Sequence, residues 1–147
     1  MRKLISLSLG LAALLAGAAP ASAQQKEPYR VIVNAANPAT SISRDELARV
    51  YMKKMTSWKT GAAVAVVDQS PRSDVRAAFS TSVLGRDVAT MKNYWQQSLF
   101  SGRGVPPIEQ PGDAQVAAFV ATNANAIGYV SPSAALPDGV RVLEITR

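Results

Sequence analysis

The amino-acid sequence predicts an α/β fold with a mixed, mostly parallel sheet flanked by helices. Strand-like and helical patterns alternate along the chain, as they do when parallel strands are joined by helical crossovers. The strand-like run at residues 63–67 is continuously apolar, which is typical of a strand covered on both faces. We expect a single domain over residues 24–147, because a chain of this length supports one hydrophobic core.

Each element has its own signal. Ser43 and Glu46 form a capping box ahead of a helical pattern, Gly85 and Asp87 separate two further helices, and Trp58 anchors a loop at residues 53–61. We expect strands at residues 29–33, 63–67, 108–110, 126–130 and 140–145, and helices at residues 44–52, 71–84, 87–100 and 113–123. The expected inward-facing residues are Val75, Ala78, Phe79, Ser82 and Val83 on the second helix, Val88, Met91, Trp95 and Leu99 on the third, and Val116, Phe119, Val120 and Asn123 on the fourth.

The first 23 residues have the composition of a secretory signal peptide. Arg2 and Lys3 precede an apolar run, and Ala21-Ser22-Ala23 supplies the small residues typical of a cleavage site. No charged stop-transfer segment follows the run. We therefore expect cleavage after Ala23, export of residues 24–147 and no membrane anchor.

The composition excludes several classes of function. The sequence has no histidine and no cysteine, so catalysis by Ser-His-Asp or Cys-His groups is impossible and the usual metal ligands are missing. The formal net charge of +6 comes from scattered residues, which favours small anions or acidic surfaces over nucleic acid. We expect no catalysis, no metal site, no cofactor and no nucleic-acid partner.

The expected ligand site is the turn between the strand at 63–67 and the next helix. Ser70 is placed as the N-cap and Pro71 at the first helical position, so that unpaired backbone N–H groups face an incoming anion. Arg72 and Arg76, one turn apart and off the buried face, offer guanidinium groups that bind oxyanions. The alternative is that Ser70 only caps an ordinary helix.

Three segments occur in a recognisable order. Residues 47–54 are followed by Thr56-Ser57-Trp58, then by residues 64–79, and later by Ala126-Ile127-Gly128-Tyr129-Val130-Ser131. In this order they resemble the second lobe of the phosphate-binding proteins of bacterial ABC importers. The resemblance covers residues 31–145, and it implies a lobe of a periplasmic binding protein that holds phosphate or a related oxyanion.

The chain departs from this family in two ways. The expected domain supplies one lobe where the family closes two around the anion. Aligned with the family's phosphate loop, Ser73 matches the loop serine, whereas Asp74 and Val75 stand where the family has Gly and Thr, and Gln69 replaces the upstream Arg. The ligand-binding residues implied are Ser70, Arg72, Ser73 and Arg76, with Gln69 and Asp74 as accessory residues. The Asp74 carboxylate either occupies the anion's place or helps to select the ligand.

Two functions follow as hypotheses. The first is a periplasmic binding module for phosphate or another oxyanion that serves an ABC permease, with a homodimer as a possible source of the second lobe. The second is an interaction protein of the cell envelope that keeps the lobe fold without a ligand. It would contact its partner through the loop at residues 53–59 and the loop around Arg103.

Overall fold

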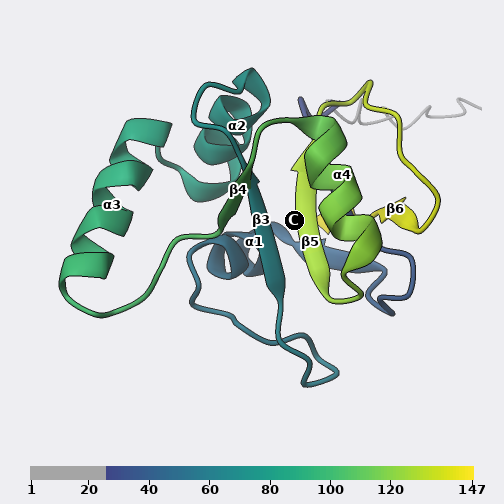
Figure 1. Ribbon diagram of the computed structural model, residues 1–147, viewed down its shortest axis with the longest axis horizontal. Helices are drawn as coiled ribbons and strands as arrows, with labels where there is room; N and C mark the ends of the chain where they lie inside the picture. The colour runs from purple at the N-terminus through teal and green to yellow at the C-terminus, as the bar shows by residue number, and fades with distance from the viewer. Residues whose placement is uncertain (1–25) are drawn as a thin grey trace, which may run out of the picture.

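The computed structural model describes residues 26–147 (Figure 1), so the expected signal peptide lies outside the described residues. The strands are β1 (Arg30–Asn34), β2 (Ser41–Ser43), β3 (Ala65–Gln69), β4 (Ile108–Gln110), β5 (Ala126–Val130), β6 (Val140–Val142) and β7 (Glu144–Thr146). The helices are α1 (Arg44–Tyr51), α2 (Asp74–Phe79), the π-helical turn η1 (Ser80–Leu84), α3 (Val88–Phe100) and α4 (Asp113–Thr122). None of the helices in residues 26–147 has the length and hydropathy needed to span a membrane.

The main sheet is mixed, as predicted. Its five strands lie in the order β4-β3-β5-β1-β6, in which β3 pairs in parallel with both β4 and β5. β1 runs antiparallel to its neighbours β5 and β6. A second, two-stranded parallel sheet joins β2 to β7.

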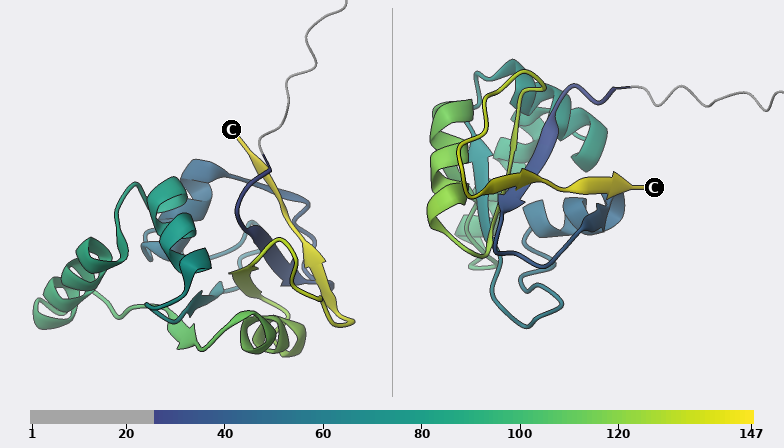
Figure 2. Two further views of the ribbon diagram at one scale, coloured as in Figure 1. Left: turned by 90° about the horizontal axis from the view of Figure 1, so that it is seen from above. Right: turned by 90° about the vertical axis from the view of Figure 1, so that its right-hand side faces the viewer.

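Helices cover both faces of the main sheet. Figure 2 shows α4 (light green) on one side and α1 (blue) on the other. The α4 face is aliphatic and is centred on Ile32, Val67 and Val116. The opposite face is more aromatic, because the rings of Phe79 and Tyr129 stack there with centroids 3.9 Å apart. α3 contacts η1 and stands apart from the sheet (Figure 1).

The second helix begins later than predicted. Its N-cap is Ser73, whose hydroxyl accepts a hydrogen bond from the Arg76 backbone N–H at 3.2 Å, so the prediction of Ser70 as N-cap was wrong. Pro71 and Arg72 belong to a turn instead, which is closed by the bond from the Ser73 N–H to the Ser70 carbonyl. The first helical turn therefore carries Arg76 toward the sheet, and Arg76 is buried rather than off the buried face.

Four other predictions need correction. Ser82 was expected to face inward but is exposed. The strand expected at residues 63–67 is β3, two residues further along, and β2 was missed because it has only three residues. The segment expected as one strand at residues 140–145 is two strands in different sheets, separated by the buried side chain of Leu143. Leu99 was expected to face inward but is 50% exposed, since α3 packs on η1 and its C-terminal end extends past it.

The capping box of α1 is present as predicted. The Ser43 side chain accepts a hydrogen bond from the Glu46 N–H, and the Glu46 carboxylate accepts one from the Ser43 N–H at 3.0 Å. We expect Ser43→Ala to lower the free energy of unfolding by about 1 kcal/mol, because the Glu46 N–H loses its partner. Urea unfolding measures the change. Ser57→Ala, at an exposed loop serine, serves as the control and should change the stability by less than about 0.5 kcal/mol.

Candidate functional site

The predicted ligand site lies at the carboxyl end of β3. In open α/β sheets this edge is where ligands usually bind. β3 ends with Asp68 and Gln69, both buried, and the chain then turns through residues 70–73 into α2. The structure therefore places polar side chains where the sheet, the turn and the first turn of α2 meet.

Gln69 connects these elements through its side-chain amide. Its Oε1 accepts a hydrogen bond from the Ser73 hydroxyl at 2.7 Å. Its Nε2 donates to the Asp113 carboxylate at 2.8 Å and to the Tyr129 carbonyl at 3.0 Å. Because both ends of the amide are engaged, Gln69 fixes the position of Ser73 rather than offering free groups to a ligand.

Arg76 points back from α2 toward the ends of β3 and β4. Its Nη1 donates to the Gln69 carbonyl and to the Glu109 carboxylate, both at 2.6 Å. Its Nη2 lies 3.3 Å from an Asp68 carboxylate oxygen, and the Arg76 side chain is only 9% exposed. The guanidinium group is thus held by two carboxylates, which together carry more charge than it does.

The register of the sheet brings these two carboxylates together. β3 and β4 pair in parallel with Asp68 opposite Glu109. Burial raises the pKa of Asp68, although the Arg76 guanidinium opposes this effect. Arg76 keeps a pKa above its ordinary value, because the charges of Asp68 and Glu109 outweigh the cost of burial. Arg76 therefore compensates an acidic pair that the strand register creates.

Tyr129 and Asp113 complete the polar network. The Tyr129 hydroxyl donates to Asp68, and burial raises the pKa of Tyr129 far above its ordinary value. Asp113 accepts hydrogen bonds from the Ser131 N–H and hydroxyl as well as from Gln69. Burial raises the pKa of Asp113, but these hydrogen bonds outweigh it and hold the pKa below its ordinary value. The network links β3, β5 and the start of α4.

The other predicted site residues lie further out. The Ser70 hydroxyl accepts a hydrogen bond from the Arg72 N–H at 3.3 Å, and the side chains of Arg72 and Asp74 are exposed. The structure therefore brings Gln69, Ser73 and Arg76 together and leaves Arg72 and Asp74 at the surface above them.

Little space remains beside Arg76. The cavity lined by Asp68, Arg76 and Tyr129 has a volume of about 10 Å³, which is close to the minimum for one water molecule. Within residues 26–147, acidic side chains do not gather in groups of three that could hold a metal ion. An oxyanion would need Arg76 or one of its partners to move.

Glu109, Tyr129 and Asp113 were not predicted as members of this network. Each lies far from Arg76 in the chain, so neither spacing nor composition connects them. One signal was available for Glu109: residues 108–110 were predicted as an edge strand, and pairing that strand beside β3 brings its central residue close to Asp68.

Residues 25–144 match the family model described as PBP superfamily domain. The chain therefore belongs to this family. Several solved structures of other proteins superpose on this chain and have the same fold. A candidate phosphate ABC transporter substrate-binding protein from Clostridium perfringens, solved with bound phosphate, is 24% identical to the chain and superposes with a TM-score of 0.64. The alignment covers 80% of this chain and 44% of that protein.

Two further solved structures have the same fold. The ABC-type phosphate transport receptor from Vibrio cholerae is 22% identical, with a TM-score of 0.62, and is aligned over 80% of this chain and 46% of its own. PstS from Borrelia burgdorferi is 14% identical, with a TM-score of 0.57 and coverage of 81% and 47%. This PBP superfamily domain thus spans less than half the length of the solved proteins it resembles. No curated protein matches it with significance.

Proposed function

We propose that the chain is a solute-binding domain that recognises an oxyanion, such as inorganic phosphate, at the turn between β3 and α2. The observation that supports this most is the Arg76 guanidinium at the carboxyl ends of three parallel strands. It donates to the carbonyl of Gln69, the residue whose side chain accepts a hydrogen bond from the Ser73 hydroxyl. Solved proteins of the same fold are described as phosphate transport proteins. We further propose that the domain acts in the periplasm after removal of residues 1–23, serves an ABC permease and has no catalytic activity.

In this proposal the anion replaces Glu109 as the partner of Arg76. Of the two carboxylates, Asp68 is nearly buried, whereas Glu109 is 45% exposed and lies on the edge strand β4. An oxyanion that displaces Glu109 would gain Nη1 of Arg76, and the exposed Arg72 and the half-buried Ser70 would contact it from the turn. Asp68 would then be the carboxylate beside the ligand, a place where it could accept a hydrogen bond from a protonated phosphate. Further ligand contacts would come from a second copy of the chain or from another protein.

Glu109→Gln tests this proposal. Removing the competing negative charge should strengthen binding of inorganic phosphate at least tenfold, measured by isothermal titration calorimetry, and Arg72→Ala should weaken it. Glu144→Gln removes a carboxylate from β7 and serves as the matched control, which should leave the affinity unchanged. Absence of heat with phosphate or sulfate for both the natural chain and Glu109→Gln would contradict the proposal.

A second function is favoured by the charge balance at Arg76. Two carboxylates already compensate the charge of this guanidinium, so the Arg76 network needs no bound anion. In this second proposal the domain binds a protein partner and no ligand at Arg76. Its contact surface would be the loop at residues 53–59 and the exposed loop around Arg103. The calorimetric experiment separates the two functions, because only the first predicts saturable anion binding that responds to Glu109→Gln.

A further inference from the structure

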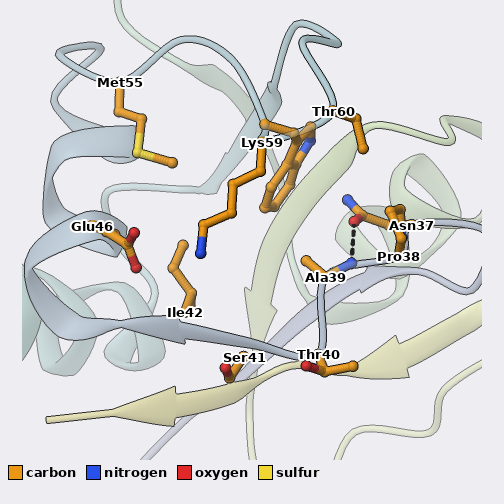
Figure 3. A pocket seen from close by; sticks show the side chains of 11 residues that line it. Asn37, Pro38, Ala39, Thr40, Ser41, Ile42, Glu46, Met55, Lys59 and Thr60 are labelled. Carbon is orange, nitrogen blue, oxygen red and sulfur yellow. Dashed lines mark hydrogen bonds between the residues drawn. The ribbon is translucent and has the colours of Figure 1, made fainter.

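A second cavity formed by residues 26–147 lies away from Arg76. It has a volume of about 320 Å³ and is formed by the segment between β1 and α1 and by the loop at residues 55–60 (Figure 3). This volume is within the range of pockets that hold small molecules.

The cavity lies at the end of the sheet where β3 and β5 begin. The turn between β3 and α2 lies at the other end, where these strands finish. β1 runs antiparallel to β5, while β3 runs parallel to β5. The end of β1 therefore lies beside the start of β5, at the same end of the sheet as the start of β3. Asn37, just after β1, lines the cavity, and so does Trp58, whose Nε1 donates to the Asn125 carbonyl next to the start of β5. A ligand in this cavity would therefore not share contacts with Arg76.

One part of the cavity wall is apolar. Ile42, Met55 and Trp58 line it, and the indole is held in place by its hydrogen bond to Asn125. An apolar group of a ligand would bind favourably against this wall, since it would leave water for contact with an aromatic face and two aliphatic side chains.

Two opposite charges also face the cavity. Figure 3 shows the Lys59 amino group and the Glu46 carboxylate pointing toward each other across it. Within residues 26–147 no ion pair joins Lys59 to Glu46. Hydrogen bonds from the Ser43 backbone and side chain lower the pKa of Glu46, so Glu46 carries its negative charge at neutral pH.

Asn37 adds a hydrogen-bond donor without a partner. Its side chain is buried, with 5% exposed, and its Oδ1 accepts from the Ala39 N–H at 2.9 Å. This bond fixes the orientation of the amide and directs Nδ2 away from Ala39, on the side where Thr60 lies in Figure 3. Nδ2 is buried and has no hydrogen-bond partner. Because Nδ2 has almost no accessible surface, a ligand in the cavity would reach it only if the Asn37 side chain turned.

We propose that this cavity binds a small zwitterion, namely a free amino acid with an apolar side chain. Its carboxylate faces Lys59, its ammonium group faces Glu46, and its side chain packs on Trp58, Met55 and Ile42. A ligand with a single charge would leave either Lys59 or Glu46 without a counter-charge. The zwitterion satisfies both charges, which is why we favour it over a simple carboxylate or amine.

Titration of the full chain with L-leucine and L-phenylalanine tests the proposal. At least one of them should bind saturably, measured by calorimetry or by Trp fluorescence. The matched analogues 4-methylpentanoate, which lacks the ammonium group, and 3-methylbutylamine, which lacks the carboxylate, should bind at least tenfold more weakly than leucine. Absence of saturable binding of either amino acid up to about 10 mM, a weak affinity by protein standards, would overturn the proposal, as would equal binding of an analogue.

Variants locate the site. Lys59→Met and Glu46→Gln should each weaken amino-acid binding at least tenfold, and Glu46→Gln keeps a residue type that supports a capping box. Lys54→Met changes an exposed lysine of the same loop that does not line the cavity, and it should leave binding unchanged. Phosphate binding should be the same in Lys59→Met as in the natural chain. The proposal for this cavity and the proposal for the Arg76 site are therefore tested independently. Unchanged amino-acid affinity in both Lys59→Met and Glu46→Gln would overturn the proposal.

Discussion

Arg76→Met is expected to lower the free energy of unfolding by about 3–5 kcal/mol, measured by urea unfolding at neutral pH. The Arg76 side chain is nearly buried between Asp68 and Glu109, and its removal leaves the buried Asp68 carboxylate without a counter-charge. Breaking a buried ion pair from one side typically has a cost of this size. Methionine fills most of the same volume, so the loss is mainly electrostatic.

Two measurements distinguish this cause from lost packing. The double variant Arg76→Met with Asp68→Asn should recover part of the stability, because the uncompensated charge is gone. The deficit of Arg76→Met should also shrink as the pH falls toward about 4, near the ordinary pKa of an aspartate. Burial raises the pKa of Asp68 in the folded state, so the folded chain binds a proton more readily than the unfolded chain and acid relieves the cost. A deficit that is constant with pH and unchanged in the double variant would contradict the electrostatic explanation.

Gly128→Ala is expected to lower the free energy of unfolding by about 1–3 kcal/mol, since overpacking a core has this typical cost. Gly128 lies in the central strand β5 beneath α4. A Cβ atom there would lie 2.7 Å from Val116 Cγ1 and 2.9 Å from Val67 Cγ1, closer than carbon atoms can approach. Both valines are fully buried, so neither can move away without disturbing the sheet or α4.

Gly112→Ala provides the matched control. A Cβ at Gly112 would meet only Gln115 Oε1, at 3.6 Å, which is an ordinary contact distance, and the backbone of Gly112 is extended. Its effect in the same urea experiment should stay below about 1 kcal/mol, the cost of an alanine at the N-cap of α4. If both alanine variants were equally stable, α4 would not lie as close to β5 as the structure places it.

The fold could be predicted from the sequence because its signals are local. The capping box at Ser43 and Glu46, Gly85 with φ of 64° and the N-cap Asp87 each report on their own neighbourhood, and each is present as predicted. The start of α2 shows the limit of such signals. Ser70-Pro71 and Ser73 are both reasonable beginnings, and the choice of Ser73 coincides with its hydrogen bond to Gln69, whose side chain is fixed by β5 and Asp113.

The candidate site was predicted only in part. The sequence analysis placed Ser73, Gln69 and Arg76 in one turn, because they are close along the chain. It did not predict that Arg76 would be buried, since the carboxylate of Glu109 arrives from a strand 33 residues away. Pairing between distant strands decides this charge balance, and a single sequence contains little information about such pairing.

The small parallel sheet has a consequence for biosynthesis. β2 contributes Ser41 and Ile42 to the wall of the cavity proposed to bind an amino acid. The strand that pairs with β2 is β7, which lies about 100 residues later in the chain. While the protein is being made on a ribosome, this wall has no strand to pair with until residues 144–146 have emerged. A nascent chain that ends just after Ser131 would therefore contain every residue of the Arg76 network but not the finished cavity.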